Sequence, residues 1–190
     1  MVKRVYTVVF IIIIVNIYLK AQNNISFFEE HIDFNLDNKF FSINGIYSFY
    51  NNSDKIANQQ IIFPFAARLN LIDTIRIIDL NSLKKIQFKL MDSAIYFDIS
   101  LKPKDTLNVN IFYRQITSNK NTYIITTTQK WGHPLDKAFY TLTAPNEMII
   151  NSFSYPPDSL YCNNDNKLYK WEKYHFSPKF DFDILINKSK

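Results

Sequence analysis

The sequence contains very little glycine, with only Gly45 and Gly132 among its 190 residues. Loops that cradle phosphates need several glycines at fixed spacing, so neither a Walker loop nor a dinucleotide-binding pattern is possible. A Gly-x-Ser-x-Gly nucleophile elbow is excluded for the same reason. Asparagine and aspartate must therefore supply most of the special turn conformations. Gly45 interrupts an alternating segment, where a glycine marks a bulge or the close approach of another group.

Cysteine is equally scarce, and the single residue Cys162 excludes an intramolecular disulfide. The three histidines, His31, His133 and His175, are far apart and form no His-Glu-x-x-His pattern. Spacing therefore indicates no metal site. We predict no cofactor, and the sequence favours a protein that is not an enzyme.

Helical periodicity is also lacking, since no segment of ten or more residues beyond the N-terminus repeats with a period of 3.6. The composition instead includes 17 Phe and 12 Tyr, and 16% of the residues are aromatic. These residue types favour pleated surfaces. With 47% apolar residues, the chain is able to form a core as one domain.

Residues 93–115 carry the strongest strand signal. Apolar side chains occupy every second position from Ile95 to Leu101 and again from Leu107 to Tyr113, on either side of a turn at Pro103. This pattern predicts a β-hairpin.

Short strands separated by turn residues fill most of the remaining chain. Pro64 predicts that its strand lies at a sheet edge or contains a bulge. Residues 155–167 are predicted to be a polar loop. Further strands are expected at residues 25–35, 39–50, 59–66, 75–80, 84–90, 122–129, 138–143, 148–153, 168–176 and 179–186. Many strands without intervening helices predict an all-β antiparallel β-sandwich.

Residues 1–22 have the pattern of a secretory signal peptide, which would form a helix before the sandwich. Lys3 and Arg4 precede an apolar core at residues 8–19, and Ala21 provides a small residue for cleavage. The apolar run is shorter than the roughly 20 residues that span a membrane. We predict a signal peptide at 1–22, one domain at 23–190, and a secreted or periplasmic protein. The alternative is an uncleaved N-terminal anchor, which would be the only attachment to a membrane.

The formal net charge of +5 does not indicate nucleic-acid binding. Three of the 22 basic residues lie in the predicted leader, leaving 19 against 17 acidic residues. The remaining lysines are scattered, which is typical of a solvated surface. We therefore predict that no nucleic acid is a partner.

The loop from Trp131 to Asp136 combines a large aromatic residue, a glycine, a titratable imidazole and a proline. Loops at the rim of a sandwich often bind partners. Trp131, His133 and Asp136 are therefore the predicted binding residues, with an envelope protein or a glycan as the partner. The alternative is that Trp131 closes the end of the core and the loop only turns the chain.

Residues 71–79, 86–90, 99–103 and the Val-x-Ile-x-Tyr strand at 109–113 follow an order that resembles the N-terminal β-sandwich of gluzincin zinc aminopeptidases. The matched residues are structural, and this sequence has no His-Glu-x-x-His helix. The resemblance implies an aminopeptidase-N-domain-like sandwich, with an immunoglobulin-like one as the alternative, and no activity. The whole chain, including residues 126–145, is similar to small exported all-β bacterial proteins of no assigned function. Its Asn-, Ile- and Lys-rich composition suits a Gram-negative source.

The prediction for function is an exported, non-catalytic binding or accessory protein of the bacterial envelope. Two alternatives remain open. One is a small exported hydrolase with a site near His133 and Asp136, and the other is a structural envelope protein that self-associates.

Overall fold

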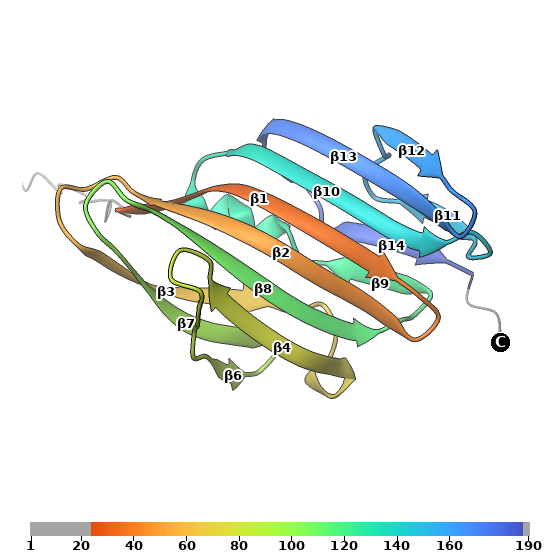
Figure 1. Ribbon diagram of the computed structural model, residues 1–190, viewed down its shortest axis with the longest axis horizontal. Helices are drawn as coiled ribbons and strands as arrows, with labels where there is room; N and C mark the ends of the chain where they lie inside the picture. Colours follow the sequence, from red (N-terminus) through yellow and green to blue (C-terminus); the bar gives the residue numbers. More distant parts are fainter. Residues whose placement is uncertain (1–23, 188–190) are drawn as a thin grey trace, which may run out of the picture.

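The computed structural model describes residues 24–187, which form fourteen strands and two short 3-10 helices. Figure 1 shows the strands packed as layers, with the long ones running side by side. Within residues 24–187 no helix is both long and apolar enough to cross a membrane. The predicted leader, 1–22, lies outside the described residues.

The larger layer is an eight-stranded sheet in the order β12-β13-β10-β1-β2-β8-β4-β5. Strands β1 and β10 pair in parallel and the other neighbours are antiparallel. The strands are β12 (Ser159–Cys162), β13 (Asn166–Phe176), β10 (Leu135–Pro145), β1 (Ile25–Leu36), β2 (Phe40–Asn51), β8 (Thr106–Ile116), β4 (Ile72–Asp79) and β5 (Lys84–Lys85).

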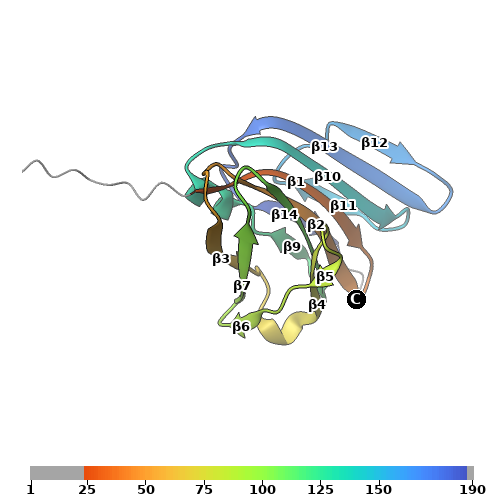
Figure 2. The ribbon, with the colours of Figure 1, turned by 60° about the vertical axis from the view of Figure 1, so that its left-hand side comes forward.

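The second layer consists of two separate three-stranded sheets on one face of the long sheet (Figure 2). One has the order β3-β7-β6 and the other β11-β14-β9, so β3 and β9 are both edge strands. The edge position predicted from Pro64 is therefore confirmed. These strands are β3 (Ala57–Pro64), β7 (Ala94–Leu101), β6 (Lys89–Met91), β11 (Ile150–Phe153), β14 (Phe182–Ile186) and β9 (Lys120–Tyr123). The predicted all-β sandwich is confirmed.

The core lies between the two layers and is rich in aromatic rings. Phe63 of β3 contacts Tyr113 of β8, with ring centroids 5.9 Å apart. Phe34 of β1 lies 5.1 Å from Phe182 of β14. The same long sheet thus packs against both small sheets, and edge-to-face and offset ring contacts stabilise each junction.

The predicted hairpin at residues 93–115 is wrong, although its alternation is right. Residues 95–101 and 107–113 bury every second side chain as expected. However, β7 pairs with β3 and β6, whereas β8 pairs with β2 and β4. The turn between them carries the chain from one layer to the other. Period-two alternation shows that a strand has one buried face, but it does not show which strand is its neighbour. Here both strands bury their apolar faces in the same core, from opposite layers.

Two other predictions need correction, the single strand at residues 84–90 and the loop at residues 155–167. Residues 84–90 contain β5, which pairs with β4 in the long sheet, and the start of β6, which pairs with β7. Ile86 and Phe88 pack against the core between these short strands, which accounts for the alternation. The polar loop predicted at 155–167 contains β12, which adds an edge to β13.

Candidate ligand pocket

One acidic side chain, that of Glu30, lies on the buried face of β1. The strand begins with odd-numbered residues facing inward (Ile25, Phe27) and continues with even-numbered residues inward from Glu30 to Leu36. A shift in the pairing with β2 between Phe27 and Glu29 changes the phase. Bulges of this kind re-aim side chains. Here the bulge turns Glu30 into the core, where it is 1% exposed.

Two tyrosine hydroxyls donate to the Glu30 carboxyl group, and a third hydroxyl bonds to one of them. Tyr140 of β10 donates to Oε1, and the hydroxyl of Tyr123 of β9 donates to Oε2 over 3.3 Å. The hydroxyls of Tyr123 and Tyr47 are 3.0 Å apart. Four strands from both layers therefore converge on one buried polar cluster.

Gly45 allows Tyr47 to take its place in this cluster. A Cβ atom at Gly45 would lie 2.5 Å from the Tyr47 hydroxyl and 2.7 Å from Cδ1 of Ile32. Real Cβ atoms do not approach other atoms so closely, so the Tyr47 ring can lie over position 45 only because no side chain is there. The close approach predicted at this glycine is confirmed.

The electrostatics of the cluster follow from its burial. Loss of solvent raises the pKa of Glu30 from 4.5 to about 7, although the hydrogen bonds from Tyr140 and Tyr123 act in the opposite direction. Burial, and then the nearby Glu30 charge, raise the pKa values of Tyr47, Tyr123 and Tyr140 well above 10. Within residues 24–187 no Lys, Arg or His forms an ion pair with Glu30. Its carboxylate therefore has hydroxyl donors but no balancing cation.

A cavity of about 300 Å³ lies beside this cluster. Strand β3 lines it from Gln59 to Pro64, and the 3-10 helix η2 (Thr126–Trp131) contributes further lining residues. Exposed Ile62 and Lys130 belong to the lining, as does buried Glu30, so the cavity extends from the surface to Glu30. Six of the lining residues are aromatic, namely Phe27, Tyr47, Phe49, Phe63, Tyr123 and Trp131.

Helix η2 forms where the sequence predicts the strand 122–129, and that prediction is wrong beyond Tyr123. Oδ1 of Asp181 accepts hydrogen bonds from the N–H groups of Ile125 and Thr126, and the Thr128 hydroxyl donates to the Ile125 carbonyl. Such side-chain bonds to the backbone compete with a strand ladder. Gly132, with a φ of 75°, follows the last residue of η2.

Trp131 stands at the end of η2 and contributes to the cavity wall. Its ring lies 5.9 Å from that of Phe27 and 5.8 Å from that of Phe49. His133 and Asp136 are exposed and do not line the cavity. The Nδ1 atom of His133 lies 2.9 Å from the Pro134 carbonyl oxygen of its own loop. Of the three predicted binding residues, Trp131 alone lines the cavity, and the binding role of all three stays a prediction.

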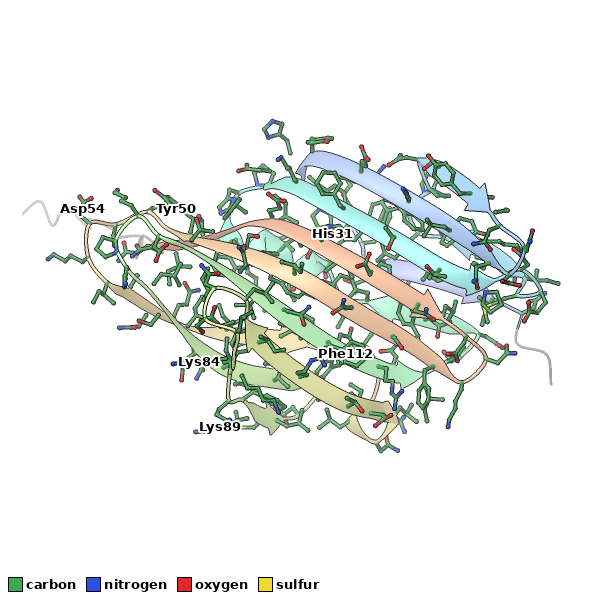
Figure 3. The ribbon with its side chains drawn as sticks, viewed as in Figure 1. His31, Tyr50, Asp54, Lys84, Lys89 and Phe112 are labelled. Atoms are coloured by element: carbon green, nitrogen blue, oxygen red, sulfur yellow. The ribbon has the colours of Figure 1, made fainter. Side chains whose placement is uncertain are left out.

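The other histidines lie elsewhere on the surface. His31 is exposed on the outer face of the long sheet (Figure 3), whereas its neighbour Glu30 is buried. His175 is also exposed. Among residues 24–187 no group of His, Cys, Asp or Glu side chains is arranged to hold a metal ion.

Sequence reasoning missed Glu30, although the sequence contains a signal for it. Apolar residues occupy odd positions in the first part of residues 25–36 and even positions in the last part, and such a phase change predicts a bulge. Glu30 is the first even position after that change. The tyrosines around Glu30 are far apart in the sequence, and Tyr47 and Tyr123, for example, are separated by 76 residues. No rule based on residue spacing identifies them.

No protein-family model and no curated protein matches this sequence. Solved structures do share its fold. A Legionella pneumophila protein, described as a candidate nutrient-binding protein, aligns with a TM-score of 0.65 and 16% identity over 87% of this chain and 67% of its own. The M1 zinc metallopeptidase of Deinococcus radiodurans aligns with a TM-score of 0.53 and 10% identity over 86% of this chain.

At these identities the likeness shows the fold alone. The chain spans only 43% of the length of the metallopeptidase. The resemblance to zinc aminopeptidases that residues 71–113 suggested is confirmed for the fold, and the aligned region extends over most of the chain.

Proposed function

We propose that this protein is a non-catalytic binding module that holds a small, largely apolar ligand in the cavity between β3 and η2. The observation that carries the proposal is the cavity of about 300 Å³, whose lining combines six aromatic residues with the buried acidic residue Glu30. Ligand sites are concave and mostly apolar, with a few convergent polar groups and a residue of shifted pKa. This cavity has each of those features.

Two further observations support a binding role. The cavity volume is at the lower end of the range for small-molecule sites, about 300–1,000 Å³. The Legionella pneumophila neighbour is described as a candidate nutrient-binding protein. We extend the proposal to an exported accessory protein of the bacterial envelope, secreted or periplasmic, with an envelope protein or a glycan as the partner of its outer surface.

The test is a thermal-shift screen of small apolar compounds against the purified protein and two variants. Trp131→Ala removes a wall of the cavity, whereas Tyr174→Ala changes an exposed ring of β13 that does not line it. Compounds that raise the Tm of the unmodified protein and of Tyr174→Ala should lose that effect in Trp131→Ala. Equal shifts in all three proteins would show that the cavity is not the site.

The same screen with His133→Ala and Asp136→Ala tests whether the exposed half of the loop at residues 131–136 contributes to ligand binding. Because neither residue lines the cavity, a loss of the thermal shift in these variants would show that the ligand extends over the loop. An unchanged shift would restrict binding to the cavity.

A further inference from the structure

We propose that the ligand of this cavity carries an organic ammonium group, which the Glu30 carboxylate binds at the inner end while the apolar body of the ligand lies against Phe27, Phe49 and Trp131. The inference rests on the proposed function, since it names the chemical class of the ligand for the same cavity.

The first argument is the unbalanced charge of the buried carboxylate. A carboxylate removed from water is costly unless a cation and hydrogen bonds compensate it. Tyr140 and Tyr123 each donate one hydrogen bond to Glu30. A carboxylate has about four lone-pair positions, so acceptor capacity remains for a donor that enters the cavity. An ammonium group supplies both the missing positive charge and further N–H donors.

The second argument is the aromatic character of the path to Glu30. The rings of Phe27 and Phe49 have centroids 5.3 Å apart, and the Trp131 ring lies within 5.9 Å of both. This cluster presents a continuous apolar surface. Cations bind favourably over aromatic faces within about 6 Å of the ring centroid. The rings that line the cavity together with Glu30 therefore favour a cation with an apolar body.

The third argument excludes the opposite charge. An anionic ligand would meet Glu30 and the lining residues Tyr47 and Tyr123 at the inner end of the cavity, and the Tyr123 hydroxyl already donates to the carboxyl group. Lys130 is the basic residue of the lining, and it is exposed. An anion therefore finds a positive charge only at the surface.

The inference also fixes the direction of the pH dependence. The groups that face Glu30 are Tyr47 of β2, Tyr123 of β9 and Tyr140 of β10, and the pKa values of all three are raised, so they stay neutral near pH 7. Glu30, with its pKa of about 7 in the free protein, must ionise to bind a cation. About 1% of the carboxyl groups are ionised at pH 5 and about 90% at pH 8, so ammonium binding should strengthen about 100-fold over this interval.

The experiment compares 2-phenylethylammonium with 2-phenylethanol by titration calorimetry on the purified unmodified protein. The two probes share a body and differ in charge. At pH 8 we expect the ammonium to bind at least about tenfold more tightly than the alcohol, an advantage that disappears at pH 5. Glu30→Gln should remove this advantage while the alcohol still binds, and Tyr174→Ala should change neither affinity.

A second measurement does not depend on the folding of Glu30→Gln. The carboxyl carbon of Glu30 can be titrated by NMR in the unmodified protein, and 2-phenylethylammonium should lower its apparent pKa whereas 2-phenylethanol should not. If the alcohol binds and the ammonium binds no better at pH 8, or if the Glu30 titration is unmoved, the ammonium inference is wrong and the binding module stands. If neither probe binds in a manner sensitive to Trp131→Ala, both proposals fail.

Discussion

At the scale of single residues, Glu30 makes the stability of the folded protein depend on pH. Its pKa is about 7 in the folded chain against 4.5 in the absence of burial. Because the folded state holds the proton more tightly, the contribution to stability is fully present below about pH 4.5 and is lost as pH rises through about 7. The side chain therefore makes the folded protein more stable in mild acid than in mild base.

Glu30→Gln should remove this pH dependence. In the unmodified protein the free energy of unfolding should fall by on the order of 3 kcal/mol between pH 5 and pH 8 through this group, and the amide, which cannot ionise, should abolish that slope. Denaturant unfolding in acetate and phosphate buffers, which contain no amine, measures it.

The matched control is Glu29→Gln, one residue earlier at the bulge and not buried. It should leave the slope in place. Asp73 and Asp158 do not interfere, because their pKa values are lowered from 3.8 by Arg114 and Lys173 respectively, so their contribution is lost only at more acidic pH. A slope that survives in Glu30→Gln would assign the pH dependence to another group.

Single residues also show how much of the site the sequence could predict. Trp131 was identified because a large aromatic residue in a turn-rich loop is distinctive, and it lines the cavity. Glu30 was missed because a glutamate in an alternating strand is normally an outward-facing residue. Only the bulge, a departure from period two, reverses that expectation.

At the scale of elements, the sequence predicts strands well and their partners poorly. The buried faces of β7 and β8 follow directly from the alternation of their apolar residues. Their assignment to different sheets does not, because it depends on pairing with β3 and β2, which are distant in the chain. The run Ile125–Thr128 likewise favours a strand by composition, but a carboxylate from residue 181 supports a helical turn instead.

Asp181→Ala should therefore loosen η2. The substitution leaves the N–H groups of Ile125 and Thr126 without their charged acceptor, and such a loss costs about 1–3 kcal/mol. Because Trp131 ends this helix, its ring should become more accessible. Denaturant unfolding measures the stability, and acrylamide quenching of tryptophan fluorescence reports the ring, since Trp171 is only 1% exposed.

The control for this substitution is Asp165→Ala, which changes an exposed side chain in the turn before β13. It should affect neither stability nor quenching. If Asp181→Ala lowers stability without changing the quenching, Asp181 stabilises β14 rather than the wall of the pocket.

At the scale of the whole molecule, the second layer is divided, and the pocket lies at the division. The edge strand β3 lines the cavity along its length, and Tyr123 and Ile124 at the end of β9 line it from the other small sheet. The backbone groups of β3 that do not pair with β7 have no strand partner in the described chain. A ligand that fills the cavity therefore contacts both small sheets and the long sheet at once.

Hydrogen exchange tests this arrangement. We expect the slowest amide exchange in β1, β2, β8 and β10, which have a strand on both sides, and faster exchange in the edge strands β3, β9 and β12. Saturating 2-phenylethylammonium at pH 8 should slow exchange in β3 and β9, because closing the cavity restricts local opening of both edges. Strand β12 is the internal control, since it is an edge strand that does not line the cavity. Slowing of β12 to the same degree would indicate general stabilisation, and unchanged exchange in β3 and β9 would place the ligand outside the divided layer.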